Sequence, residues 1–242
     1  MCSSIKKFPI IQSQLFAGVL ILCLGISSGS ALGQRRSAGN VARQTSDSKK
    51  TLALGDFYYK NNDISDKAAI QYRRVRDSNP KSAEGATAQY FLGSYYHRKF
   101  YIQREKKLKE DFGLLVEAQG QYEDYANKYA FNSPSPEWLS DAYFNLALIF
   151  LQRGDTWKAE HFLGKMYGAS TNDSRIYIYQ VVWSPNSKDV VDSNLDARQL
   201  AQFTNSLIYG ARNAQKQQPQ QQQAPSFDYM IDRIRQWCLS HK

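Results

Sequence analysis

Acyl transfer by a serine nucleophile is the first chemistry that the residues suggest. Residues 25–29 (GISSG) have the letters of a nucleophile elbow. That motif requires a strand, a sharp turn and a helix, together with a histidine that accepts the serine proton. Here the five residues lie in a segment that we expect to be removed from the mature protein. We therefore interpret the match as chance.

General acid–base and metal chemistry would require histidines and acids that cluster. His97, His161 and His241 are each isolated in sequence from other ligand types, and a lone histidine on a helix usually packs or faces solvent. Paired acids such as Glu123-Asp124 are typical of a solvated helix face. The sequence also contains no phosphate-binding glycine loop and no dinucleotide fingerprint. We expect no enzyme, no cofactor, no metal and no small-molecule substrate.

The amino terminus has the order of a secretory signal peptide. Lys6 and Lys7 precede an apolar run from Leu15 to Ile26, and small residues follow as far as Gly33. The run is about 12 residues long, whereas a stable membrane-spanning helix takes about 20. The sequence predicts a signal peptide over residues 1–33 and a location in the periplasm or on the periplasmic face of an outer membrane.

The cysteines leave one alternative open. Cleavage after Gly33 would remove Cys2 and Cys23 and leave Cys238, so no internal disulfide is expected. Cys23 could instead be a lipidated cysteine, because Leu20 occupies the position three residues before it. The residue immediately before Cys23 is not small, as that motif usually requires.

The charge favours acidic partners. The chain has a formal net charge of +9 and a pI of about 9.3. Such an excess suits acidic proteins or anionic lipid headgroups. The export signal argues against nucleic acid as a partner.

The elements that would position any site are helical. We predict an additional helical region at residues 171–214, in which 176–183 fit either a strand or a buried helix. The Gln/Pro-rich composition of residues 215–225 is typical of a linker. The predicted organisation is a flexible leader at 34–48, helices at 49–170 and 171–214, the linker at 215–225 and an amphipathic helix at 226–242.

Residues 49–170 contain a repeated pattern of two helices. A first helix carries Leu-Gly or Leu-Ala with an aromatic residue three positions later, and a second carries alanine followed by bulky residues four and seven positions later. The pattern resembles the tetratricopeptide repeat, a helix hairpin of about 34 residues. It comprises Leu54, Gly55, Tyr58, Ala68, Tyr72 and Val75; Leu92, Gly93, Tyr96, Ala118, Tyr122 and Tyr125; and Leu146, Ala147, Phe150, Ala159, Leu163 and Met166.

The second repeat is interrupted by 13 residues more than the pattern expects. They fall in the charged stretch 98–113, which we expect to lengthen the hairpin. The third repeat is complete, with its turn at Gly154-Asp155. The predicted fold is therefore all-α, a tetratricopeptide-repeat solenoid of antiparallel helix hairpins with extra C-terminal helices.

One family resemblance is visible in the first repeat. Residues 55–60 (GDFYYK), 68–75 (AAIQYRRV) and 79–82 (NPKS) resemble the first repeats of the BamD family of outer-membrane assembly lipoproteins. Periplasmic cell-division coordinator proteins share the same style of repeat. The resemblance covers roughly residues 50–168. It implies a scaffold that binds envelope proteins, and the C-terminal third departs from it.

A repeat solenoid presents a concave surface lined mainly by its first helices, and we predict a peptide-binding groove there. An alternative is a peripheral membrane- or cell-wall-associated structural protein that acts through its basic surface. The C-terminal helix could cap the solenoid, or dock on a partner or a membrane. The predicted groove residues are Tyr59, Lys60, Tyr90, His97, Arg98, Asp141 and Phe144.

Overall fold

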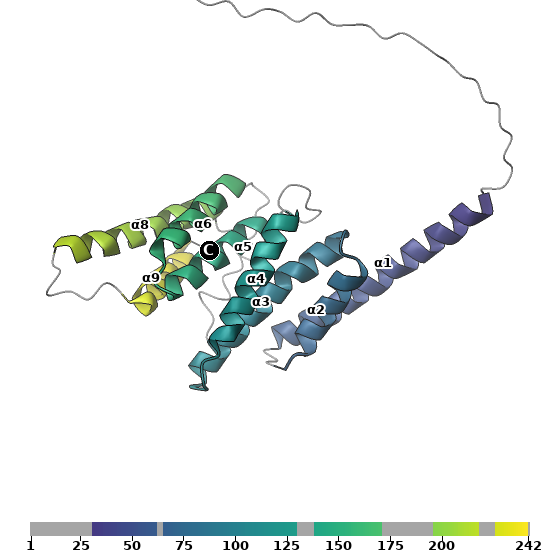
Figure 1. The fold of residues 1–242 in the computed structure, drawn as a ribbon, viewed down its shortest axis with the longest axis horizontal. Coiled ribbons are helices and arrows are strands. Elements are labelled where there is room, and N and C mark those ends of the chain that lie inside the picture. The colour runs from purple at the N-terminus through teal and green to yellow at the C-terminus, as the bar shows by residue number, and fades with distance from the viewer. Residues whose placement is uncertain (1–30, 62–64, 130–137, 171–195, 218–225, 242) are drawn as a thin grey trace, which may run out of the picture. The chain divides into compact units, whose positions relative to one another are not determined.

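A computed structural model describes residues 31–61, 65–129, 138–170, 196–217 and 226–241. Within these residues the protein is helical and has no strand, which confirms the predicted all-α class (Figure 1). Residues 1–30 of the predicted signal segment, Cys23 among them, and the ambiguous run 176–183 lie outside the described residues, whereas residues 31–33 belong to the first helix. No helix in the described ranges is both long and apolar enough to cross a bilayer.

The chain divides into two units, Met1–Ala42 and Arg43–Lys242. In the first unit the structure describes residues 31–42, which are helical and form the start of α1. The second unit contains the rest of α1 and the following helices. The helices are α1 (Ala31–Lys60), α2 (Lys67–Ser78), α3 (Ala83–Glu105), α4 (Phe112–Tyr129), α5 (Leu139–Gln152), α6 (Thr156–Ala169), α8 (Ala197–Gln217) and α9 (Phe227–Ser240).

Two predicted boundaries were wrong. The expected flexible leader, residues 34–48, belongs to α1. This segment contains alanine, arginine and glutamine and has no proline, so nothing stops the helix from extending towards its amino terminus. At the other end, α8 continues to Gln217 and takes in the first three residues of the predicted linker at 215–225. The predicted C-terminal helix is present as α9.

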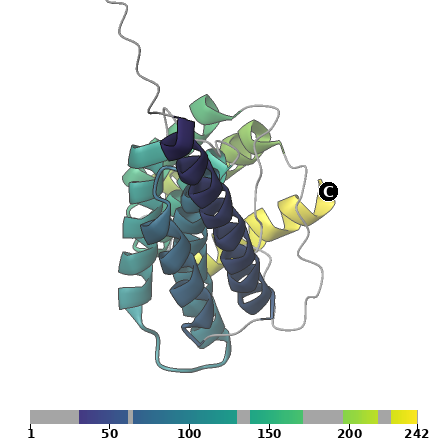
Figure 2. The ribbon, with the colours of Figure 1, turned by 90° about the vertical axis from the view of Figure 1, so that its right-hand side faces the viewer.

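Consecutive helices pack against one another along the chain. α2 contacts α3, α3 contacts α4, α4 contacts α5, α5 contacts α6, and α6 contacts α8. Figure 2 shows α2, α3 and α4 side by side. One hydrophobic cluster is built from α1 to α5, and a second from α5, α6, α8 and α9. Residues of α5 belong to both clusters, so this helix joins them.

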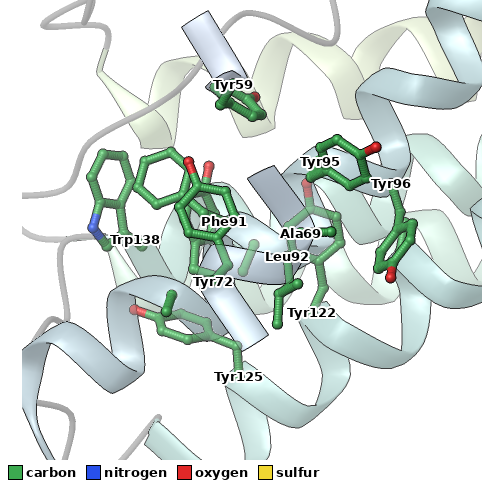
Figure 3. Close-up of a cluster of buried hydrophobic side chains, with 14 of the residues drawn as sticks. Tyr59, Ala69, Tyr72, Phe91, Leu92, Tyr95, Tyr96, Tyr122, Tyr125 and Trp138 are labelled. Atoms are coloured by element: carbon green, nitrogen blue, oxygen red, sulfur yellow. The ribbon is translucent and has the colours of Figure 1, made fainter. Parts of the chain in front are cut away.

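The first cluster is rich in aromatic rings (Figure 3). Tyr90 stacks on Trp138 with ring centroids 4.8 Å apart, and Phe91 stacks on Tyr72 at 5.6 Å. Tyr90 also meets Tyr125 edge-on at 5.8 Å. Rings from α2, α3 and α4 and from the start of α5 therefore interlock, and this fixes the spacing between neighbouring helices.

A glycine in each of the first two hairpins faces the ring of its second helix. A Cβ added at Gly55 would lie 2.7 Å from the Tyr72 ring, and one added at Gly93 would lie 2.8 Å from the Tyr122 ring. These two tyrosines occupy equivalent positions in the sequence pattern, and both are fully buried. The small residue and the large ring therefore fit together in the same way in both hairpins.

The extra residues of the second hairpin lengthen α3. α1 and α5 end two residues after Tyr58 and Phe150, whereas α3 continues for nine residues after the equivalent Tyr96. The predicted effect of the insertion at 98–113 is confirmed. The predicted turn between α5 and α6 is also present, because Gly154 takes a positive φ of 75° and Asp155 caps α6 by accepting the Lys158 N–H at 3.0 Å.

Substitution of Gly93 by alanine tests the contact between small residue and ring. The new methyl group would push the buried Tyr122 ring aside, so we expect the free energy of unfolding to fall by about 1–2 kcal/mol despite the better helix propensity of alanine. Gly120 in α4 is the matched control, because it is exposed and nothing lies within 4 Å of a Cβ there. Gly120→Ala should raise stability by about 0.5–1 kcal/mol in urea denaturation. Equal effects at both sites would contradict this packing.

Candidate protein-binding surface

The residues predicted to line a peptide groove are mostly interior. Lys60 is exposed, and the others are buried and cannot contact a peptide lying on the surface. The repeat pattern predicts an open inner face on the first helices, whereas these side chains are buried there. The buried residues are Tyr59, Tyr90, His97, Arg98, Asp141 and Phe144.

Four of these residues join α3 to α5 or to α1 through hydrogen bonds. The Tyr90 hydroxyl donates to Asp141 Oδ2. The same carboxylate oxygen accepts Asn145 Nδ2 at 2.7 Å. Burial, and then the negative charge of Asp141, raise the pKa of Tyr90 well above its ordinary value, so the phenol keeps the proton that it donates. A buried carboxylate is tolerated when donors surround it, so this cluster holds two helices together.

A second polar group joins α1 to α3. The Tyr59 hydroxyl lies 2.6 Å from Ser94 Oγ, and Arg98 donates to the Tyr59 backbone carbonyl. The Arg98 guanidinium also lies over the Tyr59 ring, 4.5 Å from its centroid. The contacts of Tyr59 and Arg98 therefore link α1 of the first hairpin to α3 of the second.

His97 is buried beside these groups. Neither ring nitrogen makes a hydrogen bond of good geometry, and the ring packs 5.1 Å from that of Tyr101. Burial lowers the pKa of His97 from 6.5 to about 3, and the nearby Asn145 side chain opposes this only in part. The imidazole is therefore neutral at physiological pH and serves packing.

One pair of uncovered apolar side chains lies on the first helix of the first hairpin. Leu54 and Phe57 of α1 are 42% and 61% exposed. The equivalent positions of the second hairpin, Leu92 and Tyr95, are 0% and 3% exposed. In the third hairpin Leu146 and Ile149 are both fully buried.

The difference arises from what precedes each hairpin. α2 packs on α3 and α4 packs on α5, whereas among the described residues no helix precedes α1. Seven residues, or two turns, earlier on the same side of α1, Asp47 and Lys50 are also exposed, where the later hairpins have small or apolar residues. We call the four side chains Asp47, Lys50, Leu54 and Phe57 the leading face.

The sequence held a signal for the leading face. Leu54 belongs to the repeat pattern, and Phe57 shares its side of the helix because it lies three residues further on. A position that is apolar in every repeat is buried only if another hairpin covers it. Comparison of the first repeat with the other two would have singled out this pair.

No described group of three or more histidine, cysteine, aspartate or glutamate side chains could hold a metal ion. Cys238 is buried in α9. No protein-family model matches the chain, and neither the curated proteins nor the solved structures yield a match.

The lowered pKa of His97 leads us to expect that the stability of the fold depends on pH. Because the folded-state pKa is about 3 and the unfolded value is 6.5, the unfolded chain takes up a proton first as the pH falls. This histidine should therefore lower the free energy of unfolding by about 2 kcal/mol between pH 7.5 and pH 5. His97→Phe should lack that part of the loss, as measured by urea denaturation at several pH values. Parallel pH profiles for the two proteins would show that His97 is not held neutral in the interior.

Proposed function

We propose that this protein is a non-enzymatic scaffold that binds other proteins through the leading face of its first hairpin. The observation that carries the proposal is the exposure of Leu54 and Phe57, at positions that preceding helices bury in both later hairpins. The end of a helical stack is usually polar where it meets only solvent. An apolar pair at this place is what a protein partner would cover.

The partner that best fits is helical. In the later hairpins the equivalent positions are covered by a helix, α2 or α4. A partner helix could pack on α1 in the same manner, with its apolar side on Leu54 and Phe57 and charged groups towards Asp47 and Lys50. Protein interfaces typically have an apolar centre and a polar or charged rim, as the leading face does.

The proposal also includes the type of helical repeat and the location of the protein in the cell. The equivalent packing of Gly55 on Tyr72 and Gly93 on Tyr122 supports a tetratricopeptide-repeat solenoid. The resemblance of residues 55–82 to the BamD family supports a role in the bacterial envelope, in outer-membrane protein assembly. The order of residues 1–33 supports export, with a mature chain that begins at Gln34 or at a lipidated Cys23.

Leu54→Lys combined with Phe57→Lys tests the leading face. Both side chains are exposed, so the free energy of unfolding should change by less than about 1 kcal/mol. Recovery of envelope partners after crosslinking in intact cells and affinity purification should fall at least about tenfold, since two apolar anchors are lost. Mass determination of the mature amino terminus in the same sample would distinguish Gln34 from a lipidated Cys23.

Ile70→Lys is the matched control. Ile70 is 52% exposed and apolar, but it lies on α2, outside the leading face. Its variant should recover partners at the wild-type level. Partners lost equally from both variants would contradict the proposal. Binding that survives the double substitution and instead weakens with rising salt would favour the alternative, association with membrane or cell wall through the basic surface.

A further inference from the structure

The C-terminal helix α9 covers a second surface, which is separate from the leading face. Met230, Ile231, Ile234 and Cys238 are buried in the second hydrophobic cluster. Asp232, Arg233 and Gln236 on the other side are exposed. α9 is therefore an amphipathic helix whose apolar side lies on the body of the same chain.

The first end of α9 is held by the lengthened part of α3. Arg104 Nη2 donates to both carboxylate oxygens of Asp228 at 2.8 Å. Arg104 and Tyr101 both lie beyond Tyr96, in the part of α3 that α1 and α5 lack. The charges of Asp228 and Arg235 both reach the Tyr101 hydroxyl, whose pKa is raised above its ordinary value mainly by burial. The insertion in the second hairpin thus supplies the place where α9 begins.

The rest of α9 extends over α5 to α8. Phe227 packs against both hydrophobic clusters, which meet at α5. Near the other end, Trp237 stacks on Phe203 of α8 with centroids 5.4 Å apart. Figure 2 shows α9, in yellow, inclined to α2, α3 and α4 rather than parallel to them. One amphipathic helix therefore lies across α3, α5 and α8, which is how a groove holds a helical ligand.

We propose that the surface under α9 is a helix-binding site for another protein, and that α9 is an internal ligand which the partner helix replaces. The partner is an amphipathic helix with the chemistry of α9. It has an acidic residue in its first turn to meet Arg104, and apolar residues two, three, six and ten positions later, as Met230, Ile231, Ile234 and Cys238 follow Asp228.

The segment that connects α9 to α8 is compatible with the replacement of α9 by a partner helix. Residues 218–225 (QPQQQQAP) join it to α8 in the sequence, and their composition is rich in glutamine and proline, with no aromatic or aliphatic residue larger than alanine. A ligand joined to its site through a short linker typically has an effective concentration on the order of 1 mM. α9 therefore competes with partners present at micromolar concentration, and its release sets the affinity that a partner experiences.

A fluorescent peptide with the sequence of residues 226–241 is the probe. It is titrated into full-length protein that carries Ile231→Asp and Ile234→Asp, which remove the apolar contacts of the internal helix. We expect saturable binding with a dissociation constant on the order of 10 µM, because a free peptide must first become helical. Wild-type protein should bind the peptide about 100-fold more weakly, because its own α9 competes.

Two altered peptides control for specificity. A peptide with Arg233→Ala and Gln236→Ala changes only the exposed side and should bind as the native one does. A peptide with Asp228→Arg should bind several-fold more weakly, and Arg104→Glu in the protein should recover that loss. The native peptide could also fail to bind the protein with Ile231→Asp and Ile234→Asp, which we call the opened variant. If this variant still unfolds cooperatively, that failure would overturn the proposal. That result would leave the proposed binding of a partner at the leading face standing, because the leading face lies on α1.

A second route applies if the opened variant does not fold. A protease site placed within residues 218–225 allows the intact, folded protein to be cut. After cutting, excess labelled peptide should exchange with α9 while the circular dichroism of the body is retained. Exchange that fails, or a body that unfolds when α9 leaves, would show that α9 is a permanent part of the core. A wild-type dimer that forms with concentration and disappears when α9 is altered would assign the surface to a second copy of this chain and overturn a separate partner.

Discussion

The burial of α5 on all sides is the constraint on which the rest of the second unit depends. Twelve of its 14 residues are buried, from Leu139 to Leu151. A helix that is apolar all round needs cover on every side. α4 covers one side and α6 and α8 cover others, so the hairpins before and after α5 are held to the same helix. Leu146 and Ile149 belong to the first hydrophobic cluster, and Leu148 and Phe150 belong to the second.

The polar residues of α5 make this burial specific. Asp141 and Asn145 lie one turn apart on the helix, and the Tyr90 hydroxyl from α3 reaches the same carboxylate. A displacement of α5 along α3 by one turn would separate the phenol from the carboxylate, and the buried charge would lose the hydrogen bond that Tyr90 donates. Apolar packing therefore provides the attraction between these helices, and the hydrogen bonds select one alignment.

Much of this fold could be predicted from the sequence, because the repeat signature depends on local spacing. The alanine and glycine positions, the lengthened second hairpin and α9 all follow from residues that are near one another in the chain. The direction that Tyr59, Tyr90 and Arg98 face could not be predicted in the same way. It depends on neighbours such as Ser94 and Asp141, which are far away in sequence. The docking of α9 depends likewise on Arg104, which precedes Asp228 by more than a hundred residues.

The leading face and the surface under α9 have one physical origin. Each end of the helical stack has apolar side chains that need cover, and the two ends meet this need differently. At the C-terminal end α9 supplies the cover, and we propose that a similar helix of another protein replaces it. At the first hairpin, Leu54 and Phe57 are left exposed, and we propose that a different protein covers them.

The most direct test of a protein-binding leading face is site-specific photocrosslinking in living cells. A photoreactive phenylalanine analogue is incorporated at position 57, and in a separate culture at position 70 of the exposed side of α2. The account predicts a discrete crosslinked adduct with another protein from position 57 and none from position 70. The absence of any adduct at position 57, or the same adduct from both positions, would contradict it.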